Sequence, residues 1–407
     1  MKSFTLPALS TLFAGLALTH PVDLSRRAAG LSDVDVTILQ FALTLEHLEN
    51  TFYQTAFNTF TLQHFVDAGF SEDFFLNLQF IAADESAHVV LLQTAIQGAG
   101  VVPVKPCQYN FPVTDVPSFV ALSAILESVG TSAYLGAAPF VGSKGILGVA
   151  ASIMVTEALH TSLQRSSVGA IGAPDPFGTP LDANSVFTLA AQFITSCPPE
   201  NPPLPFTAFP GLKVDAQACL AENTGAQAAA SATASNTTSA GTTAADSDSS
   251  STTTAAATSA NAAAVTTTAS AASATTESTS TGASATQTAA AQRMRARTST
   301  ASAVSCAAPS AGSALKLLPD FSASKKDLSQ VSEVFVTFIA GLNVVSVGAQ
   351  LSQSGMTAAI PNNIGGQVFV FITAIDVSGK KLSDADVLFG PAIMEVAPAV
   401  PSIVKQT

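Results

Sequence analysis

The sequence predicts an all-α bundle of four long helices with one long crossover, followed by a low-complexity stalk and a small C-terminal all-β module. Three observations predict this order. Apolar residues recur at helical spacing between residues 32 and 195, Ala, Ser, Thr and Gly dominate residues 223–313, and β-branched runs follow them. The whole-chain averages of 47% hydrophobic and 11% charged residues therefore describe no single part of the 407-residue chain.

The first 27 residues are typical of an export signal with a propeptide. Lys2 precedes an apolar run from Phe4 to Leu18, which is too short for a comfortable membrane span. The pair Arg26-Arg27 is either a dibasic processing site or plain surface charge. We expect the mature protein to begin near Ala28, to be secreted into the medium or the cell wall, and not to span a membrane.

Capping signals divide residues 28–200 into helices. A residue that caps a helix N-terminus stands before each predicted long helix, and glycine or proline stands near several of the predicted ends. The predicted starts are Ser32 with Asp35, Ser71-Glu72-Asp73, Asp115-Val116-Pro117 and Ser143, and a shorter fifth helix starts at Thr179-Pro180-Leu181-Asp182.

The connections between these helices favour a particular topology. A Pro-rich segment of about 17 residues, 99–115, joins the second helix to the third, whereas short turns make the other two connections. One long crossover is typical of ferritin-like bundles. Residues 201–222 are a Pro-rich tail of the bundle.

The remaining chain has two characters. Residues 223–313 carry too little apolar surface to fold, so we expect a disordered stalk, O-glycosylated on Ser and Thr and N-glycosylated at the sequon of Asn236. Residues 314–407 predict a small antiparallel β module, either a sandwich or a barrel. Its predicted strands are 334–339, 344–351, 368–375 and 388–396.

Two Glu-x-x-His elements lie on the second and fourth predicted helices. Residues three apart share a helix face, so each element directs one carboxylate and one imidazole to the same point. The first and third helices add lone glutamates. This is the known ligand arrangement of di-iron and di-manganese carboxylate bundles, and it predicts the metal ligands Glu46, Glu85, His88, Glu127, Glu157 and His160.

A repeated spacing supports this assignment. Tyr53 follows Glu46 by seven residues, and Tyr134 follows Glu127 by the same number. The repeat favours Glu46 over Glu49 as the ligand of the first helix, although Glu49 remains a further candidate. The two tyrosines are either hydrogen-bond partners of the ligand carboxylates, redox groups or ordinary core residues, and we favour the first role.

Charge balance also favours a metal centre. The predicted carboxylates lie in apolar helices with few basic residues nearby, and buried carboxylates without compensation are costly. Oxygen-rich ligation with one imidazole per metal suits two iron or two manganese ions better than zinc or copper(I). The alternative is that these groups lie on solvated faces. Asp84 either orients a ligand histidine or lies on the surface, and His47 and His64 are structural or surface residues.

Cysteines and net charge limit other functions. Cys107, Cys197, Cys219 and Cys306 allow three full pairings; a clasp among the first three is expected, and none has a metal-ligand spacing. A net charge of −12 without a folded basic patch argues against a nucleic-acid partner.

The sequence resembles the secreted fungal ferritin-like proteins of stress response and late sexual development, which are similar to plant desiccation-related proteins. The resemblance rests on both Glu-x-x-His elements and on the segments 41–49, 107–111, 133–138 and 390–393. It implies the bundle and a two-metal site, and all six implied ligand positions are filled.

Two main hypotheses for function follow. The first is a secreted di-metal oxidoreductase that acts on peroxide or O₂, for example as a catalase, in stress or development. The second is a cell-wall structural or metal-sequestering protein whose metal site is not catalytic. Iron storage in a hollow shell is a weaker third hypothesis, because a glycosylated stalk and an added module would crowd a cage. The sequence does not fix the oligomeric state.

Overall fold

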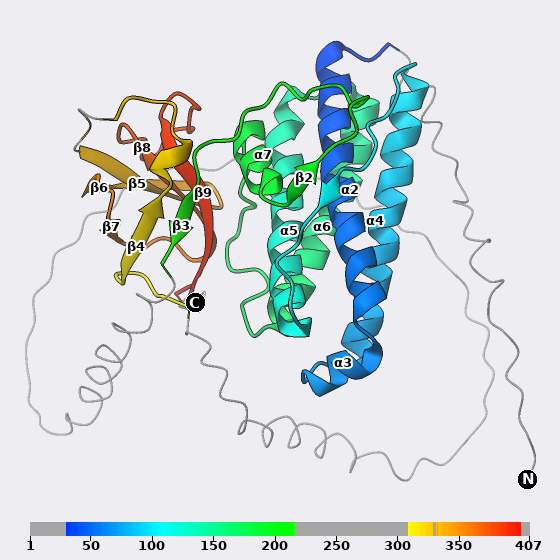
Figure 1. The fold of residues 1–407 in the computed structure, drawn as a ribbon, viewed down its shortest axis with the longest axis horizontal. Coiled ribbons are helices and arrows are strands. Elements are labelled where there is room, and N and C mark those ends of the chain that lie inside the picture. Colours follow the sequence, from blue (N-terminus) through cyan, green and yellow to red (C-terminus); the bar gives the residue numbers. More distant parts are fainter. Residues whose placement is uncertain (1–29, 216–307, 329–330, 332, 400–407) are drawn as a thin grey trace, which may run out of the picture. The chain divides into compact units, whose positions relative to one another are not determined.

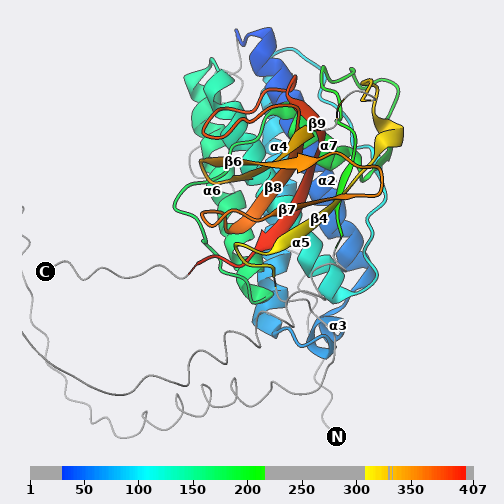
Figure 2. The same ribbon diagram turned by 90° about the vertical axis from the view of Figure 1, so that its left-hand side faces the viewer.

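Four long helices lie side by side in the computed structural model of the protein, which describes residues 30–215, 308–328, 331 and 333–399 (Figures 1 and 2). They are α2 (Asp33–Thr59), α4 (Glu72–Gly98), α5 (Val116–Ala137) and α6 (Lys144–Ser167), and a shorter α7 (Ala183–Ala191) follows. The predicted export signal, residues 223–307 of the predicted stalk, the Asn236 sequon, Cys219 and Cys306 lie outside the described residues, whereas residues 308–313, also assigned to the stalk, are described.

The predicted helix starts are confirmed by their caps. The Ser32 hydroxyl accepts the Asp35 backbone N–H at 3.1 Å, and the Asp35 carboxylate accepts the Ser32 N–H at 3.3 Å, which completes a capping box. Ser71, Asp115 and Ser143 cap α4, α5 and α6 in the same manner.

One turn contains more structure than the sequence predicts. The link between the first two long helices includes the six-residue helix α3 (Leu62–Asp67), where a plain turn was expected. Its start is stabilised by His64, whose ring Nδ1 accepts the Thr61 backbone N–H at 3.1 Å. Periodicity does not reveal such a helix, because it is too short to show an apolar stripe.

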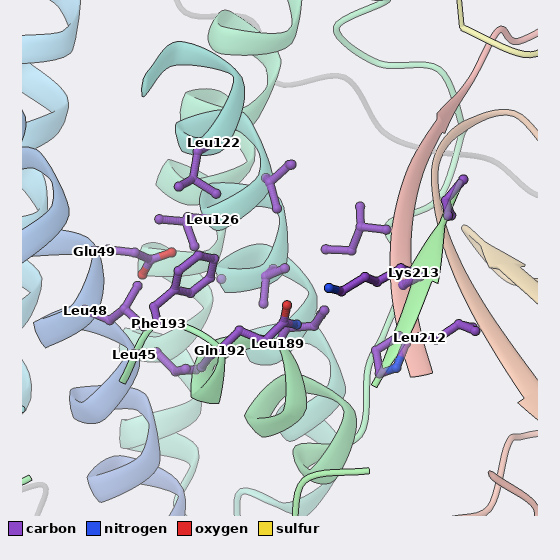
Figure 3. Close-up of a pocket in the computed structure, with 18 residues that line it drawn as sticks. Leu45, Leu48, Glu49, Leu122, Leu126, Leu189, Gln192, Phe193, Leu212 and Lys213 are labelled. Carbon is purple, nitrogen blue, oxygen red and sulfur yellow. The ribbon is translucent and has the colours of Figure 1, made fainter. Parts of the chain in front are cut away.

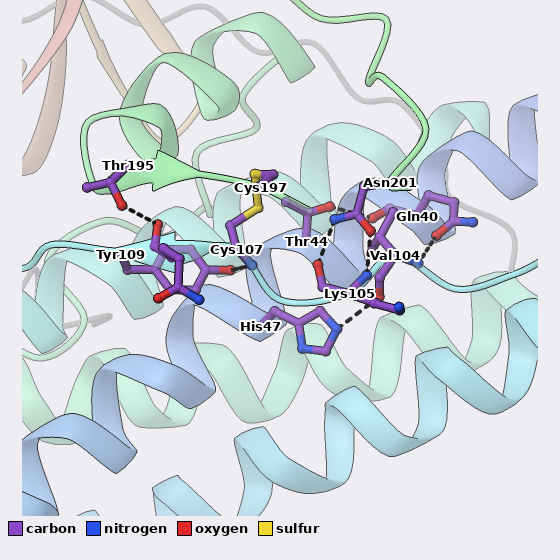
Figure 4. Close-up of a disulfide and its surroundings, with 11 residues drawn as sticks. Gln40, Thr44, His47, Val104, Lys105, Cys107, Tyr109, Thr195, Cys197 and Asn201 are labelled. Carbon is purple, nitrogen blue, oxygen red and sulfur yellow. Dashed lines mark hydrogen bonds between the residues drawn. A yellow bond between two sulfur atoms is a disulfide. The ribbon is translucent and has the colours of Figure 1, made fainter. Parts of the chain in front are cut away.

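The crossover between α4 and α5 is fixed to α2 and to the segment that follows α7 (Figure 4). Its strand β1 (Gln108–Tyr109) pairs antiparallel with β2 (Ile194–Ser196), and the disulfide Cys107–Cys197 lies beside this pair. The sequence left the pairing of the cysteines open, and the structure assigns this pair. The side chain of Gln40 on α2 holds the crossover with two bonds, to the Val102 carbonyl at 2.8 Å and from the Val104 N–H at 2.9 Å.

The C-terminal module consists of two antiparallel sheets, which confirms the predicted antiparallel β module. One sheet has the order β6-β5-β8-β9 and the other β3-β4-β7. Apolar side chains from both sheets form one core, so the module is a small sandwich. The strands are β3 (Leu212–Val214), β4 (Ala314–Pro319), β5 (Glu333–Ala340), β6 (Asn343–Gln350), β7 (Met356–Ala359), β8 (Gly366–Thr373) and β9 (Val387–Val396).

The smaller sheet changes the domain boundaries expected from sequence. Strand β3 lies in the segment 201–222, which the sequence assigned to the tail of the bundle, yet it pairs antiparallel with β4 from beyond residue 308. The sequence analysis missed β3, β4 and β7. Each of them has three to six residues, so the run is too short for a period-two pattern to be clear.

The β module shares a hydrophobic core with the helices, and both belong to one compact unit. Val368, Val370 and Ile372 of β8 face the core of the sandwich, whereas Phe369 and Phe371, which alternate with them, pack in the same cluster as the bundle residues. Burial on both faces explains why this strand is a continuous apolar run.

A partly buried ion pair connects the two parts of this unit. The Arg165 guanidinium at the end of α6 makes two bonds to the Glu395 carboxylate of β9, at 2.8 and 2.7 Å. A two-pronged contact of this kind fixes orientation as well as distance. The sandwich is therefore held in a fixed orientation against α6, the helix that carries the second Glu-x-x-His element.

By length and composition alone, two helices among the described residues are able to cross a membrane: Val116–Phe140 and Lys144–Ser167. In the most apolar 18-residue stretch of each helix, 56% of the first and 22% of the second is buried inside the protein. A core helix of a bundle meets the same criteria, and both helices direct a buried glutamate inward, Glu127 and Glu157. The expectation that the protein does not span a membrane stays a prediction.

The disulfide should contribute measurably to stability. It closes a loop with a sequence separation of 90 residues, so the double variant Cys107→Ser/Cys197→Ser should lose about 2–5 kcal/mol of unfolding free energy. Denaturant unfolding monitored by circular dichroism measures this loss. An unchanged unfolding midpoint would show that the crossover is held without the disulfide.

Candidate metal centre

The four long helices each place one glutamate at the same level of the bundle interior. Glu46 comes from α2, Glu85 from α4, Glu127 from α5 and Glu157 from α6, and all four are buried to 1% exposure or less. The histidines of the two Glu-x-x-His elements lie among them. The structure thus brings together all six side chains that the sequence singled out as ligands.

These side chains form two overlapping groups. The first consists of Glu46, Glu85, His88 and Glu157, and the second of Glu85, Glu127, Glu157 and His160. Within each group the potential ligand atoms lie within 4.8 Å of one another. Because Glu85 and Glu157 belong to both groups, their carboxylates are placed to bridge two ions.

Each histidine directs one ring nitrogen at several carboxylates. His88 Nδ1 lies 3.2 Å from Glu46 Oε2, 3.3 Å from Glu85 Oε2 and 3.2 Å from Glu157 Oε1. His160 Nδ1 similarly faces Glu85 and Glu127, at 3.2 and 3.0 Å. A single ring nitrogen has at most one proton to donate, so it cannot satisfy three carboxylates at once.

Several carboxylate oxygens are consequently left without a hydrogen bond. They are Glu46 Oε2, Glu85 Oε1 and both oxygens of Glu157, all buried. Three of these atoms, Glu46 Oε2, Glu85 Oε1 and Glu157 Oε1, lie within ion-pair distance of a histidine, but they lack the geometry of a hydrogen bond. Buried carboxylates in this situation require a neutralising cation or proton.

The proton affinities reflect the same charge imbalance. Burial, opposed by the nearby His88 imidazole, raises the pKa of Glu46 to about 7. Burial together with the negative charges of Glu85 and Glu127 raises the pKa of Glu157 well above its usual range. Burial alone would lower the pKa of His160, but its bonds to the Glu127 and Glu85 carboxylates raise it to about 11.

The residues present fit two divalent metal ions. Four carboxylates carry four negative charges when ionised, which two divalent cations balance. The oxygens without partners and the imidazole nitrogens are the atoms that such ions would bind, and all lie in the two groups. The buried cluster is therefore compatible with a di-metal site.

Two tyrosines bond the outer ligands in a crossed pattern. Tyr53 of α2 donates its hydroxyl to Glu127 of α5, and Tyr134 of α5 donates to Glu46 of α2 at 2.6 Å. Burial and the neighbouring carboxylates raise the pKa of both phenols, so they stay protonated donors. The geometry agrees with the role in which tyrosines orient the ligand carboxylates.

Gln164 belongs to this network and was missed by the sequence analysis. It is fully buried on α6, and its amide nitrogen donates to the Tyr53 hydroxyl and, at 3.4 Å, to Glu127. A signal for it existed. Gln164 follows Glu157 by seven residues, which is the spacing that identified the two tyrosines.

The neighbouring titratable residues have distinct roles. Asp84 Oδ2 lies 3.2 Å from His160 Nε2, so of its two expected roles the geometry favours orienting that imidazole. His47 is buried and bonds the Val104 carbonyl at 3.1 Å. His64 caps α3, so His47 and His64 are structural and lie outside both ligand groups, as expected.

Glu49 lies beside the centre but in neither ligand group. A Cβ atom on Gly130 would stand 2.7 Å from Glu157 Oε2 and 3.0 Å from Glu49 Oε1. A side chain at this position would therefore displace one or both of these carboxylates. Gly130 was also missed from the sequence, although a glycine in a helix interior often marks such a close approach.

Comparison with known proteins agrees with the helical architecture. Residues 34–170, which contain all six candidate ligands, match the ferritin-like domain family. Protein rds1 of Schizosaccharomyces pombe is 27% identical over 181 residues, which are 44% of this chain and 44% of that protein. The match thus spans less than half of either chain. The helical region of this chain is a ferritin-like domain, and the chain is distantly similar to this fungal protein.

Proposed function

We propose that the protein is a secreted di-metal carboxylate oxidoreductase that acts on peroxide or O₂ in stress or development. The single observation that carries the proposal is the pair of overlapping ligand groups with unpaired buried oxygens. An imidazole and carboxylates in each group favour iron or manganese. Secretion is supported by the Cys107–Cys197 disulfide, since stable disulfides form in oxidising compartments.

Each of the two ions would be held by its own pair of side chains and by two shared carboxylates. Glu46 and His88 would hold one ion and Glu127 and His160 the other, while Glu85 and Glu157 would hold both. A pair of iron or manganese ions supplies two-electron chemistry with peroxide or O₂ when bound. The surrounding apolar residues exclude bulk water, which strengthens every electrostatic contact in the site.

The hydrogen-bond network would keep these ligands in place. Tyr53 bonds one carboxylate oxygen of Glu127, and Tyr134 bonds one of Glu46. In each case the other oxygen stays directed into the cluster. Asp84 accepts a bond at His160 Nε2 and thereby favours Nδ1 as the metal-binding atom.

A second candidate function is a structural or metal-sequestering protein of the cell wall. The observation that favours it is the origin of the ligands, because one glutamate comes from each of the four helices. Ions bound there would cross-link the entire bundle and stabilise the fold without any turnover. Metal content and turnover measured on the same preparation distinguish the two functions.

Removing the two bridging carboxylates should abolish metal binding. The wild-type protein should carry about two iron or manganese ions per chain, and the variant Glu85→Gln/Glu157→Gln should carry almost none. Mass spectrometry of the secreted protein measures the content, and Glu72→Gln, an exposed glutamate on the same helix as Glu85, is the matched control.

Each outcome of this experiment has a defined meaning. Metal lost in the double variant but kept in the control, with peroxide or O₂ consumed by the wild type, would support the oxidoreductase. Bound metal without consumption of either oxidant would favour the structural function. A wild-type protein without metal would contradict both.

Without metal, the protein should lose stability as the pH rises. Glu46 has a pKa of about 7 in the folded state against 4.5 ordinarily, and His160 about 11 against 6.5. Each raised pKa gives stability that is fully present below the ordinary value and lost as pH rises through the folded value. Chelator-treated protein should therefore melt at a higher temperature near pH 5 than near pH 9.

The stability that the metal adds should instead increase as the pH rises. Metal ions bind deprotonated ligands, so the extra stability of the loaded protein over the chelated protein should grow over the same pH range. Calorimetry of both forms at the two pH values measures this. Chelated protein that gains stability between pH 5 and pH 9 would show that the cluster does not titrate as the geometry requires.

A further inference from the structure

A cavity of about 360 Å³ lies directly beside the candidate metal centre (Figure 3). Its walls come from α2, α5, α7, β3 and β9, so both the helices and the β sandwich contribute. Most of the lining is aliphatic, with Phe193 as the aromatic side chain and a few polar groups. Both this volume and this composition are typical of sites for small organic ligands.

The inner end of the cavity touches a candidate metal ligand. Glu49 and Gly130 line the cavity at this end. A Cβ on Gly130 would lie 2.7 Å from Glu157 Oε2, so the glycine that lines the cavity also adjoins this carboxylate. A molecule that fills the cavity would therefore lie against Glu49 and Gly130, the immediate neighbours of a carboxylate that both ligand groups share.

The outer end of the cavity carries a positive charge. Lys213 of β3 is exposed to solvent, and its ammonium extends toward the helices in Figure 3. It is the one basic side chain among the described residues that line the cavity. The cavity therefore has an apolar interior with a cation at its outer end, which is complementary to an amphiphilic acid.

We propose that this cavity binds the organic substrate of the metal centre, an apolar molecule with a single acidic group. Its acidic group lies at Lys213 and its apolar part extends to Glu49 and Gly130. The catalytic part rests on the proposed function: the organic molecule gives up two electrons and two protons, and one hydrogen peroxide becomes two waters. Binding itself requires only the cavity.

Ligand binding can be tested with a fluorescent reporter. The chain has no tryptophan, so Gln192→Trp, at an exposed residue of the cavity wall, introduces a single one. Decanoate and decan-1-ol serve as ligands with the same chain length and different charge. We expect saturable fluorescence changes with both, and a lower Kd for decanoate than for the alcohol.

Two further variants locate the bound molecule. Lys213→Met should raise the Kd of decanoate about two- to fivefold, as for an exposed ion pair, and leave that of decan-1-ol unchanged. Lys380→Met, an exposed lysine that does not line the cavity, should change neither. Ile125→Trp, which fills the cavity from α5, should weaken both ligands in calorimetry while near-ultraviolet circular dichroism shows a folded protein.

The outcomes separate this inference from the proposed function, because metal content is measured independently. Saturable binding to protein that takes up no metal would keep the cavity as a ligand site and overturn the catalytic role. Metal-loaded protein without saturable binding, or with binding insensitive to Ile125→Trp, would overturn the inference alone. Decanoate should also change the visible or paramagnetic resonance spectrum of the loaded centre. An unchanged spectrum at saturation would contradict the placement beside Glu157.

Discussion

The rest of the structure depends on one interaction, which is the mutual repulsion of four carboxylates in the apolar interior of the bundle. Glu46, Glu85, Glu127 and Glu157 are buried within reach of one another, and two histidines cannot satisfy all of their oxygens. Such a cluster is costly unless cations or protons neutralise it. The crossed tyrosine bonds and the bond from Gln164 are understandable as devices that hold the carboxylates in place. The raised pKa values of Glu46 and Glu157 have the same cause, because burial and neighbouring carboxylates favour the protonated form.

The β sandwich takes part in this arrangement rather than following it on the chain. Arg165 joins the end of α6 to Glu395, and Phe369 and Phe371 extend the core of the bundle into the sheet. These contacts fix the helix that supplies Glu157, and strands β3 and β9 close one side of the adjoining cavity. The sandwich would therefore shape what reaches the centre, while the helices hold the ligands.

The features that could be predicted from sequence are those encoded locally. Helix starts follow from caps such as Ser32, and the ligand pairs follow from a spacing of three on one helix face. Gly130 and the cavity were missed because each depends on segments far apart in the chain. Strand β3 was missed because it is short and its partner β4 is distant in sequence. Asp84 could be weighed but not decided, since its role depends on the position of His160 on another helix. Gln164 was within reach of the seven-residue repeat but lacks a side chain that suggests a ligand.

Anomalous diffraction from a crystal of the protein, recorded on both sides of the iron and manganese absorption edges, tests the central claim most directly. Two anomalous peaks per chain are predicted. One should lie among Glu46, Glu85, His88 and Glu157, and the other among Glu85, Glu127, Glu157 and His160. Both should lie within about 2.0–2.3 Å of ligand atoms. An ordered cluster with hydrogen-bonded carboxylates and no anomalous peak, in protein never exposed to chelator, would contradict the account.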